Sequence, residues 1–174
     1  MSKITVGGLV KLSQATFTRP ADTVTYTAGD VVANSTSAAV PMTFPGCAHV
    51  SKGTGLVQGA ILVDSANQAL KLDADLFLFS LLPTAFGNDN AAFTPTDAVL
   101  QTCIGVISFP ATSARNGDAT SGGGGNAICQ IGNLSIPFKC DGSTADIYGV
   151  LVARNAYVPI SASPFYITLA VLQD

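Results

Sequence analysis

The stretch ALKLDADLFLF, residues 69–79, has the two-residue alternation of a β-strand. One side of such a strand would carry only apolar side chains, those of Leu70, Leu72, Ala74, Leu76 and Leu78. The other side changes from charged to aromatic along its length, with Lys71, Asp73, Asp75, Phe77 and Phe79. We therefore expect one side to lie in a hydrophobic core. We expect the other to be half solvated and half covered by a strand, a loop or a subunit.

Further strand candidates recur along the chain and predict an all-β fold. They are TVTYT (23–27), LVQGAILV (56–63), AVLQTCIGVISF (98–109), NAICQIGNLSIPF (126–138), DIYGVLVARNAYV (146–158) and PFYITLAVL (164–172), with weaker ones near 4–10 and 40–50. About eight or nine strands separated by turn signals are typical of a sandwich or barrel. All 11 acidic residues are aspartate, which favours turns over helices. We predict a two-sheet β-sandwich of the jelly-roll type.

The 174 residues suit one domain. We expect residues 1–15 to form an N-terminal arm or edge strand and residues 16–174 to form a single β-sandwich domain. Between strands, residues 86–98 could hold a short helix. Residues 110–127 include four consecutive glycines and predict a long, exposed loop.

Charge is sparse, with 8 basic and 11 acidic residues and a net charge of −3. Scattered basic residues argue against nucleic acid as a partner, because phosphate binding needs clustered Lys and Arg. Apolar runs are much shorter than the ~18 residues of a membrane helix, and the N-terminus lacks the apolar core of a signal peptide. We expect a soluble protein made in a cytosol, its thinly charged surface kept in solution by hydroxyls or covered by partners.

The candidate chemical sites all have a simpler structural interpretation. Cys47 and His49 share a predicted strand face but lack two further metal ligands. Asp73 and Asp75 could form a glycosidase pair, yet their alternating context favours a solvated strand face. Residues 122–125 lack the Lys-Ser or Lys-Thr of a phosphate loop, and residues 140–146 read as a turn. We predict no catalytic residue, no cofactor and no metal, and hence a protein that is not an enzyme.

The sequence resembles small virion structural proteins of tailed bacteriophages. The resemblance lies in FTRPADTVTYTAGDVVANS (17–35), GLVQGAILVDS (55–65), LFLFSLLPTAF (76–86), CIGVISFP (103–110) and IPFKCDGSTADIYGVLVARNAY (136–157). It implies a capsid decoration or cement protein that stabilises the shell. It also implies binding to the major capsid protein and to its own copies, as a homotrimer or homodimer on the capsid surface of the virion. The alternative is a tail-fibre or receptor-binding tip, with an enzyme using Asp73 and Asp75 a distant third.

Two neighbouring segments are candidates for partner contact. The opening residues MSKITVGGLVKL could form an arm that adds to a neighbouring strand. In the segment that follows, Arg19 and Asp22 could instead pair with each other at the entry to an early strand. The predicted partner contacts are Lys3, Ile4, Val6, Leu9, Lys11, Phe17, Arg19, Pro20 and Tyr26.

Overall fold

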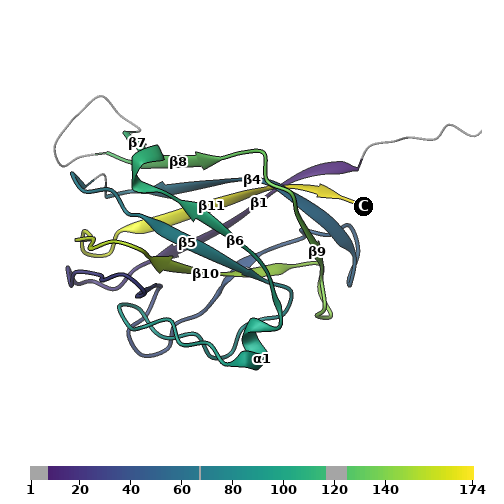
Figure 1. The fold of residues 1–174 in the computed structure, drawn as a ribbon, viewed down its shortest axis with the longest axis horizontal. Helices are drawn as coiled ribbons and strands as arrows, with labels where there is room; N and C mark the ends of the chain where they lie inside the picture. The colour runs from purple at the N-terminus through teal and green to yellow at the C-terminus, as the bar shows by residue number, and fades with distance from the viewer. Residues whose placement is uncertain (1–7, 67, 117–124) are drawn as a thin grey trace, which may run out of the picture.

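Two antiparallel sheets pack face to face in the structure, a computed structural model that describes residues 8–66, 68–116 and 125–174 (Figure 1). The first sheet has the order β1-β11-β4-β8-β7, with β9 also paired to β4. Its strands are β1 (Leu9–Thr18), β4 (Thr54–Asp64), β7 (Arg115–Asn116), β8 (Ala127–Ile131), β9 (Ile136–Lys139) and β11 (Pro164–Gln173). The second sheet has the order β2-β10-β5-β6, with β3 also paired to β10. Its strands are β2 (Val31–Val32), β3 (Met42–Phe44), β5 (Ala74–Phe79), β6 (Cys103–Phe109) and β10 (Ile147–Ala153).

The strand pairing is that of a long hairpin rolled into two layers. β1 pairs with β11, and both β2 and β3 pair with β10. β4 pairs with both β8 and β9, and β5 pairs with β6. The roll closes into two sheets because β11 also pairs with β4 and β10 also pairs with β5. All these pairs are antiparallel, and together they form a jelly roll. The predicted fold class is confirmed.

The alternation in residues 69–79 produces the expected burial. Leu72, Ala74, Leu76 and Leu78 are buried between the sheets, although Leu70 lies exposed before β5 begins. The aromatic half of the other side is covered by a loop, since the ring centroids of Phe77 and Phe93 lie 4.6 Å apart. Main-chain pairing with β10 on one side and β6 on the other makes β5 a central strand.

Several predicted boundaries are wrong. Residues 23–27 form no strand and make only an isolated bridge between Tyr26 and Tyr157. Residues 126–138 form two strands rather than one, because the backbone turns at Asn133 with a φ of 57°. Residues 98–109 begin in the short helix α1 (Asp97–Leu100), which Thr96 caps, and only then enter β6. Residues 9–15 of the expected N-terminal arm or edge strand lie in β1, which pairs with β11 along its whole length, and the division into residues 1–15 and 16–174 stays a prediction.

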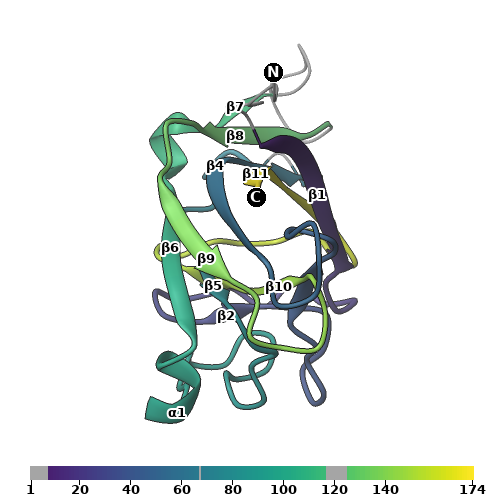
Figure 2. The same ribbon diagram turned by 90° about the vertical axis from the view of Figure 1, so that its right-hand side faces the viewer.

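The two sheets differ in what covers their outer sides. A small second core lies outside the β2-β10-β5-β6 sheet, where Phe86 and Val99 from the connection between β5 and β6 pack against Val31, Phe79 and Val152. Figure 2 shows α1 and its flanking loops below this sheet. The first sheet has no such cover among the described residues. The remaining short element, η1 (Ala111–Ser113), connects β6 to β7. No helix in the described part of the chain is long and apolar enough to cross a membrane.

Candidate functional site

The outer side of the first sheet is a broad surface that we call the open face. Burial alternates along its strands, so the residues between the buried ones point outward. The open face consists of Val10, Leu12, Gln14 and Thr16 from β1, Tyr166, Thr168, Ala170 and Leu172 from β11, Ile61 and Val63 from β4, and Ile128 and Gln130 from β8. Its polar groups are hydroxyls and amides, and Gln14 Nε2 donates to Thr168 Oγ1 over 3.2 Å.

The open face carries little charge. Among the described residues, its charged side chains lie only at the border. There Arg115 on β7 is directly opposite Ile128 and so points to the same side of the sheet, and Lys139 on β9 and Asp174 after β11 are exposed. Lys11 belongs to the opposite side of β1, because burial alternates along that strand. The centre of the open face is therefore free of charged residues, in a chain with net charge −3.

A shallow hollow of about 230 Å³ crosses the open face. It is lined by Gly59, Gly132 and Ala170, whose short or absent side chains leave the space, together with Leu12 and Ile61. The hollow is broad and open rather than enclosed, and no titratable side chain lines it. Its shape and lining suit an apolar or hydroxyl-bearing protein surface better than a reacting small molecule.

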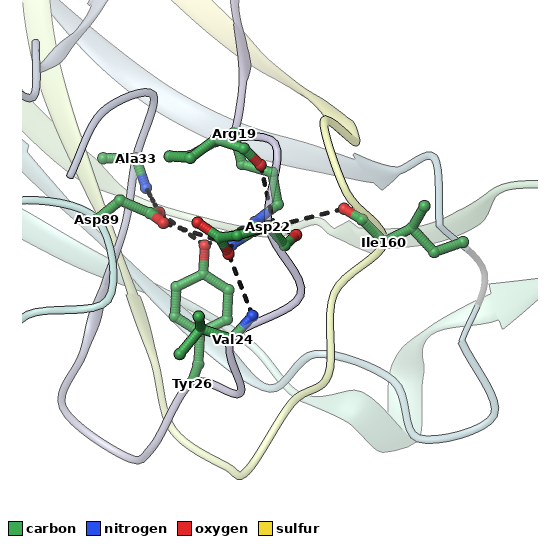
Figure 3. A network of polar contacts seen from close by, with 8 residues as sticks. Arg19, Asp22, Val24, Tyr26, Ala33, Asp89 and Ile160 are labelled. Atoms are coloured by element: carbon green, nitrogen blue, oxygen red, sulfur yellow. Dashed lines mark hydrogen bonds and ion pairs between the residues drawn. The ribbon is translucent and has the colours of Figure 1, made fainter.

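The most notable polar cluster is buried and lies at the end of β1 (Figure 3). Arg19 Nε donates to the hydroxyl of Tyr26 over 3.0 Å, and its Nη2 donates to Asp22 Oδ1 over 2.8 Å. The same nitrogen lies 3.4 Å from Asp89 Oδ2. Asp89 Oδ1 in turn accepts from the Tyr26 hydroxyl over 2.6 Å and from the Ala33 amide over 2.8 Å. The cluster therefore joins the end of β1 to two loops.

A second buried pair extends this cluster. The rings of Tyr26 and Tyr157 stack with centroids 6.4 Å apart, and the Tyr157 hydroxyl donates to Asp64 Oδ2 at the end of β4. Asp64 Oδ1 also accepts from the Ala66 amide over 2.8 Å. These contacts fix the loops at one end of the sandwich to one another.

Burial sets the protonation behaviour of the cluster. Burial raises the pKa of Asp89, against the opposing effects of the Tyr26 hydrogen bond, the Ala33 amide and the Arg19 charge. Burial likewise raises the pKa of Asp64, against the hydrogen bonds from Tyr157 and Ala66. The hydrogen bond from Arg19 lowers the pKa of the more exposed Asp22. Although burial alone would lower it, the pKa of Arg19 is raised by its bonds to Tyr26 and Asp22.

The predicted partner contacts fall into four groups. Leu9 and Lys11 are exposed on β1, whereas Lys3, Ile4 and Val6 lie outside the described residues. Phe17 and Pro20 are half-buried, and the Phe17 ring stacks on Phe165 with centroids 5.4 Å apart.

Arg19 and Tyr26 are 2% and 0% exposed, so neither offers surface to a partner in this fold. Their assignment as partner contacts is therefore corrected. The guanidinium of Arg19 can be buried because hydrogen bonds and an opposite charge within the cluster replace its hydration. The predicted pairing of Arg19 with Asp22 is confirmed.

The other candidate residues have structural partners. Cys47 is buried while His49 is exposed, so the two do not share a face. Asp75 pairs with Arg154 over 2.6 Å and accepts from Ser108 over 2.7 Å. No group of three or more His, Cys, Asp or Glu side chains within the described ranges could hold a metal ion.

Sequence reasoning missed Asp64, Asp89 and Tyr157, because no motif connects residues so far apart. It also missed the open face. The alternation in PFYITLAVL does place Tyr166, Thr168 and Ala170 on the side opposite the core residues. Nothing in that pattern reveals that this side lacks a cover.

The fold is therefore a jelly roll with one bare face whose centre is uncharged. No protein-family model matches the chain, and no curated protein matches it. Among solved structures, it is similar to the capsid of Ralstonia phage GP4, with 16% identity, a TM-score of 0.40 and coverage of 100% of this chain and 91% of that one. It is also similar to the acid-stable capsid of Helicobacter pylori bacteriophage KHP30, with 10% identity, a TM-score of 0.35 and coverage of 96% and 90%. A third similar structure is that of Desmodium yellow mottle tymovirus, with 12% identity, a TM-score of 0.31 and coverage of 98% and 90%.

Proposed function

We propose that the protein is a structural component of a bacteriophage virion that binds the capsid shell as a decoration or cement protein and acts without catalysis. The observation that carries this proposal is the open face, which has no charged residue in its centre and no cover among the described residues. The resemblance of the sequence to virion structural proteins of tailed bacteriophages supports the same role. In this proposal the open face contacts the major capsid protein, and the protein is made in the bacterial cytoplasm.

The size of the open face is suitable for a protein partner. Both β1 and β11 have 10 residues. Strands about 33 Å long and about 4.8 Å apart give four strands a footprint of roughly 600 Å². Specific interfaces bury about 800 Å² on each partner, and side-chain relief adds to a flat footprint. The uncharged centre of this face can be covered without leaving an ionised group unpaired, which would be costly.

The arrangement of titratable groups supports a role without chemistry. Asp64 and Asp89, whose pKa values burial raises, are both closed off inside the loop cluster by tyrosine hydroxyls. Burial raises the pKa of the Cys47 thiol to about 11, so this thiol is protonated and unreactive at neutral pH. These groups are placed to hold loops together rather than to meet a substrate.

The proposal is tested by sedimenting the full chain with capsids that have been stripped of accessory proteins. We expect saturable binding at a fixed number of copies per shell and a higher melting temperature of the capsid. Ile61→Lys places a charge in the middle of the open face and should abolish binding. Val40→Lys, at a loop residue that is 62% exposed, is the matched control and should bind like the wild type.

Two results would overturn this proposal. One is a wild-type protein that stays in the supernatant at every concentration, and adhesion to host cells would then favour a receptor-binding tip. The other is an Ile61→Lys variant that binds as well as Val40→Lys, which would place the capsid contact elsewhere on the surface. Circular dichroism of both variants would show that each remains folded.

A further inference from the structure

Strand β1 is a free edge of the first sheet. Its register with β11 runs from Leu9 opposite Gln173 to Thr18 opposite Pro164 without a shift. On its other side, β1 pairs with no strand in the described part of the chain. Figure 2 shows β1 at the border of the upper layer, beside β11. Along these ten residues, the main-chain N–H and C=O groups of alternate residues therefore point away from β11 and form one open edge.

This edge has few of the features that normally prevent strand association, and among them is only one charge, Lys11, on the side of β1 opposite the open face. Natural edge strands are protected by prolines, bulges, inward charges, several lysines or a covering segment. The residues of β1, LVKLSQATFT, include no proline and a single charged residue, Lys11. The continuous register excludes a bulge within β1. An edge of this length and composition is expected to be covered in the working state of the protein.

The side chains of the edge are unusually exposed for apolar residues. Leu9, Val10 and Leu12 are 64%, 70% and 67% exposed. They surround Lys11 at the start of the strand, and no acidic residue occurs in β1 to attract a basic partner. A strand that is neutral apart from one lysine is suited to a partner strand of the same kind.

We infer that β1 pairs antiparallel with β1 of a second copy of this chain across a two-fold axis, which joins two first sheets into one continuous sheet. Such an interface is self-complementary, because each copy supplies the same edge. Residues that face each other across an antiparallel pair share one side of the sheet, so Val10 and Leu12 of both copies gather on the open face. A register that sets the two Lys11 residues apart avoids direct opposition of like charges.

The expected strength follows from the size of the contact. A strand edge about 33 Å long in a layer about 10 Å thick covers roughly 330 Å² on each copy. This area is well below the ~800 Å² per partner of standard interfaces, so we expect a dimer that dissociates in the micromolar range. If two copies were bound side by side on one surface, a much larger fraction of them would be dimeric, because their effective concentration is high.

The inference is tested by sedimentation velocity of the full chain across the micromolar range. We expect the wild type to shift from the 17.7 kDa monomer to a dimer as concentration rises. Val10→Lys should raise the dissociation constant at least about tenfold, through charge repulsion at the edge. Ile61→Lys alters the open face away from the edge, and Val40→Lys alters a distant loop, so both controls should dimerise like the wild type.

Three results would overturn this inference: a wild type that stays monomeric throughout, a Val10→Lys variant that dimerises normally, or an Ile61→Lys variant that fails to dimerise. The last result would indicate dimers formed face to face. Hydrogen exchange gives a second readout, in which amides of β1 should slow with concentration while those of β6, the edge of the second sheet, stay unchanged. The inference does not rest on the proposed function, since Ile61→Lys is expected to lose capsid binding and keep the dimer.

Discussion

At the scale of single residues, the segment after β1 has an internal role. Arg19 and Tyr26 come from this segment and Asp89 comes from the connection between β5 and β6, and the three side chains satisfy one another away from water. A buried ion pair contributes little by itself, because desolvation offsets its attraction. Removing one partner is much more harmful, since it leaves the other charge buried and uncompensated.

This contrast predicts the effect of removing Arg19. Arg19→Met should lower the free energy of unfolding by about 3–5 kcal/mol, because Asp89 loses its positive partner. Arg154→Met is the matched control, since Arg154 is 39% exposed and pairs with Asp75 at the surface. That change should cost less than about 1 kcal/mol. Urea unfolding of both variants measures the difference, and equal losses would contradict the structural role of the cluster.

A second prediction concerns the dependence of stability on pH. Burial raises the pKa of Asp64 in the folded state above its ordinary value of 3.8. The folded protein therefore holds this proton more tightly than the unfolded chain, and the contribution of Asp64 falls as pH rises above that value. Asp64→Asn removes the titration. The wild type should thus lose stability relative to Asp64→Asn between about pH 4 and pH 7. A relative gain over that range in urea titrations would contradict the assignment.

At the scale of elements, the sequence predicts strands well where one side is continuously apolar. Such stretches form β4, β5, β10 and β11. In these strands the buried side chains occur at alternate positions or in longer runs. Residues 23–27 have strand-like composition but bend to deliver the Tyr26 hydroxyl to Arg19 and Asp89. Local propensity cannot anticipate such a contact, because Asp89 is remote in sequence.

The packing of β10 gives a prediction at this scale. An added Cβ at Gly149 would lie 2.8 Å from Phe44 and 2.9 Å from Leu76, both of them core side chains. Gly149→Ala should therefore cost about 1–3 kcal/mol through overpacking. At Gly132 an added Cβ meets nothing within 4 Å, so Gly132→Ala should change stability by less than about 0.5 kcal/mol. Thermal unfolding of the two variants is the test, and a harmless Gly149→Ala would mean that β10 packs more loosely than described.

At the scale of the whole molecule, the jelly roll has one covered face and one bare face. The cover of the second sheet includes Phe86, Phe93 and Val99, which follow β5. The sequence predicts the all-β class from alternation and from aspartate-rich turns. It does not predict which face stays bare, because that depends on where one long connection folds back. The sequence does not predict the burial of Arg19 and Tyr26 for a similar reason, since their partner Asp89 lies in that connection.

The most direct test of the central claim is oxidative footprinting of the full chain, free and bound to stripped capsids, read by mass spectrometry. Leu12, Ile61 and Tyr166 on the open face should lose reactivity on binding, whereas Val24 and Val40 in distant loops should keep theirs. Protection of Val24 and Val40 with full reactivity of Ile61 and Tyr166 would contradict the assignment of the open face as the capsid-binding surface.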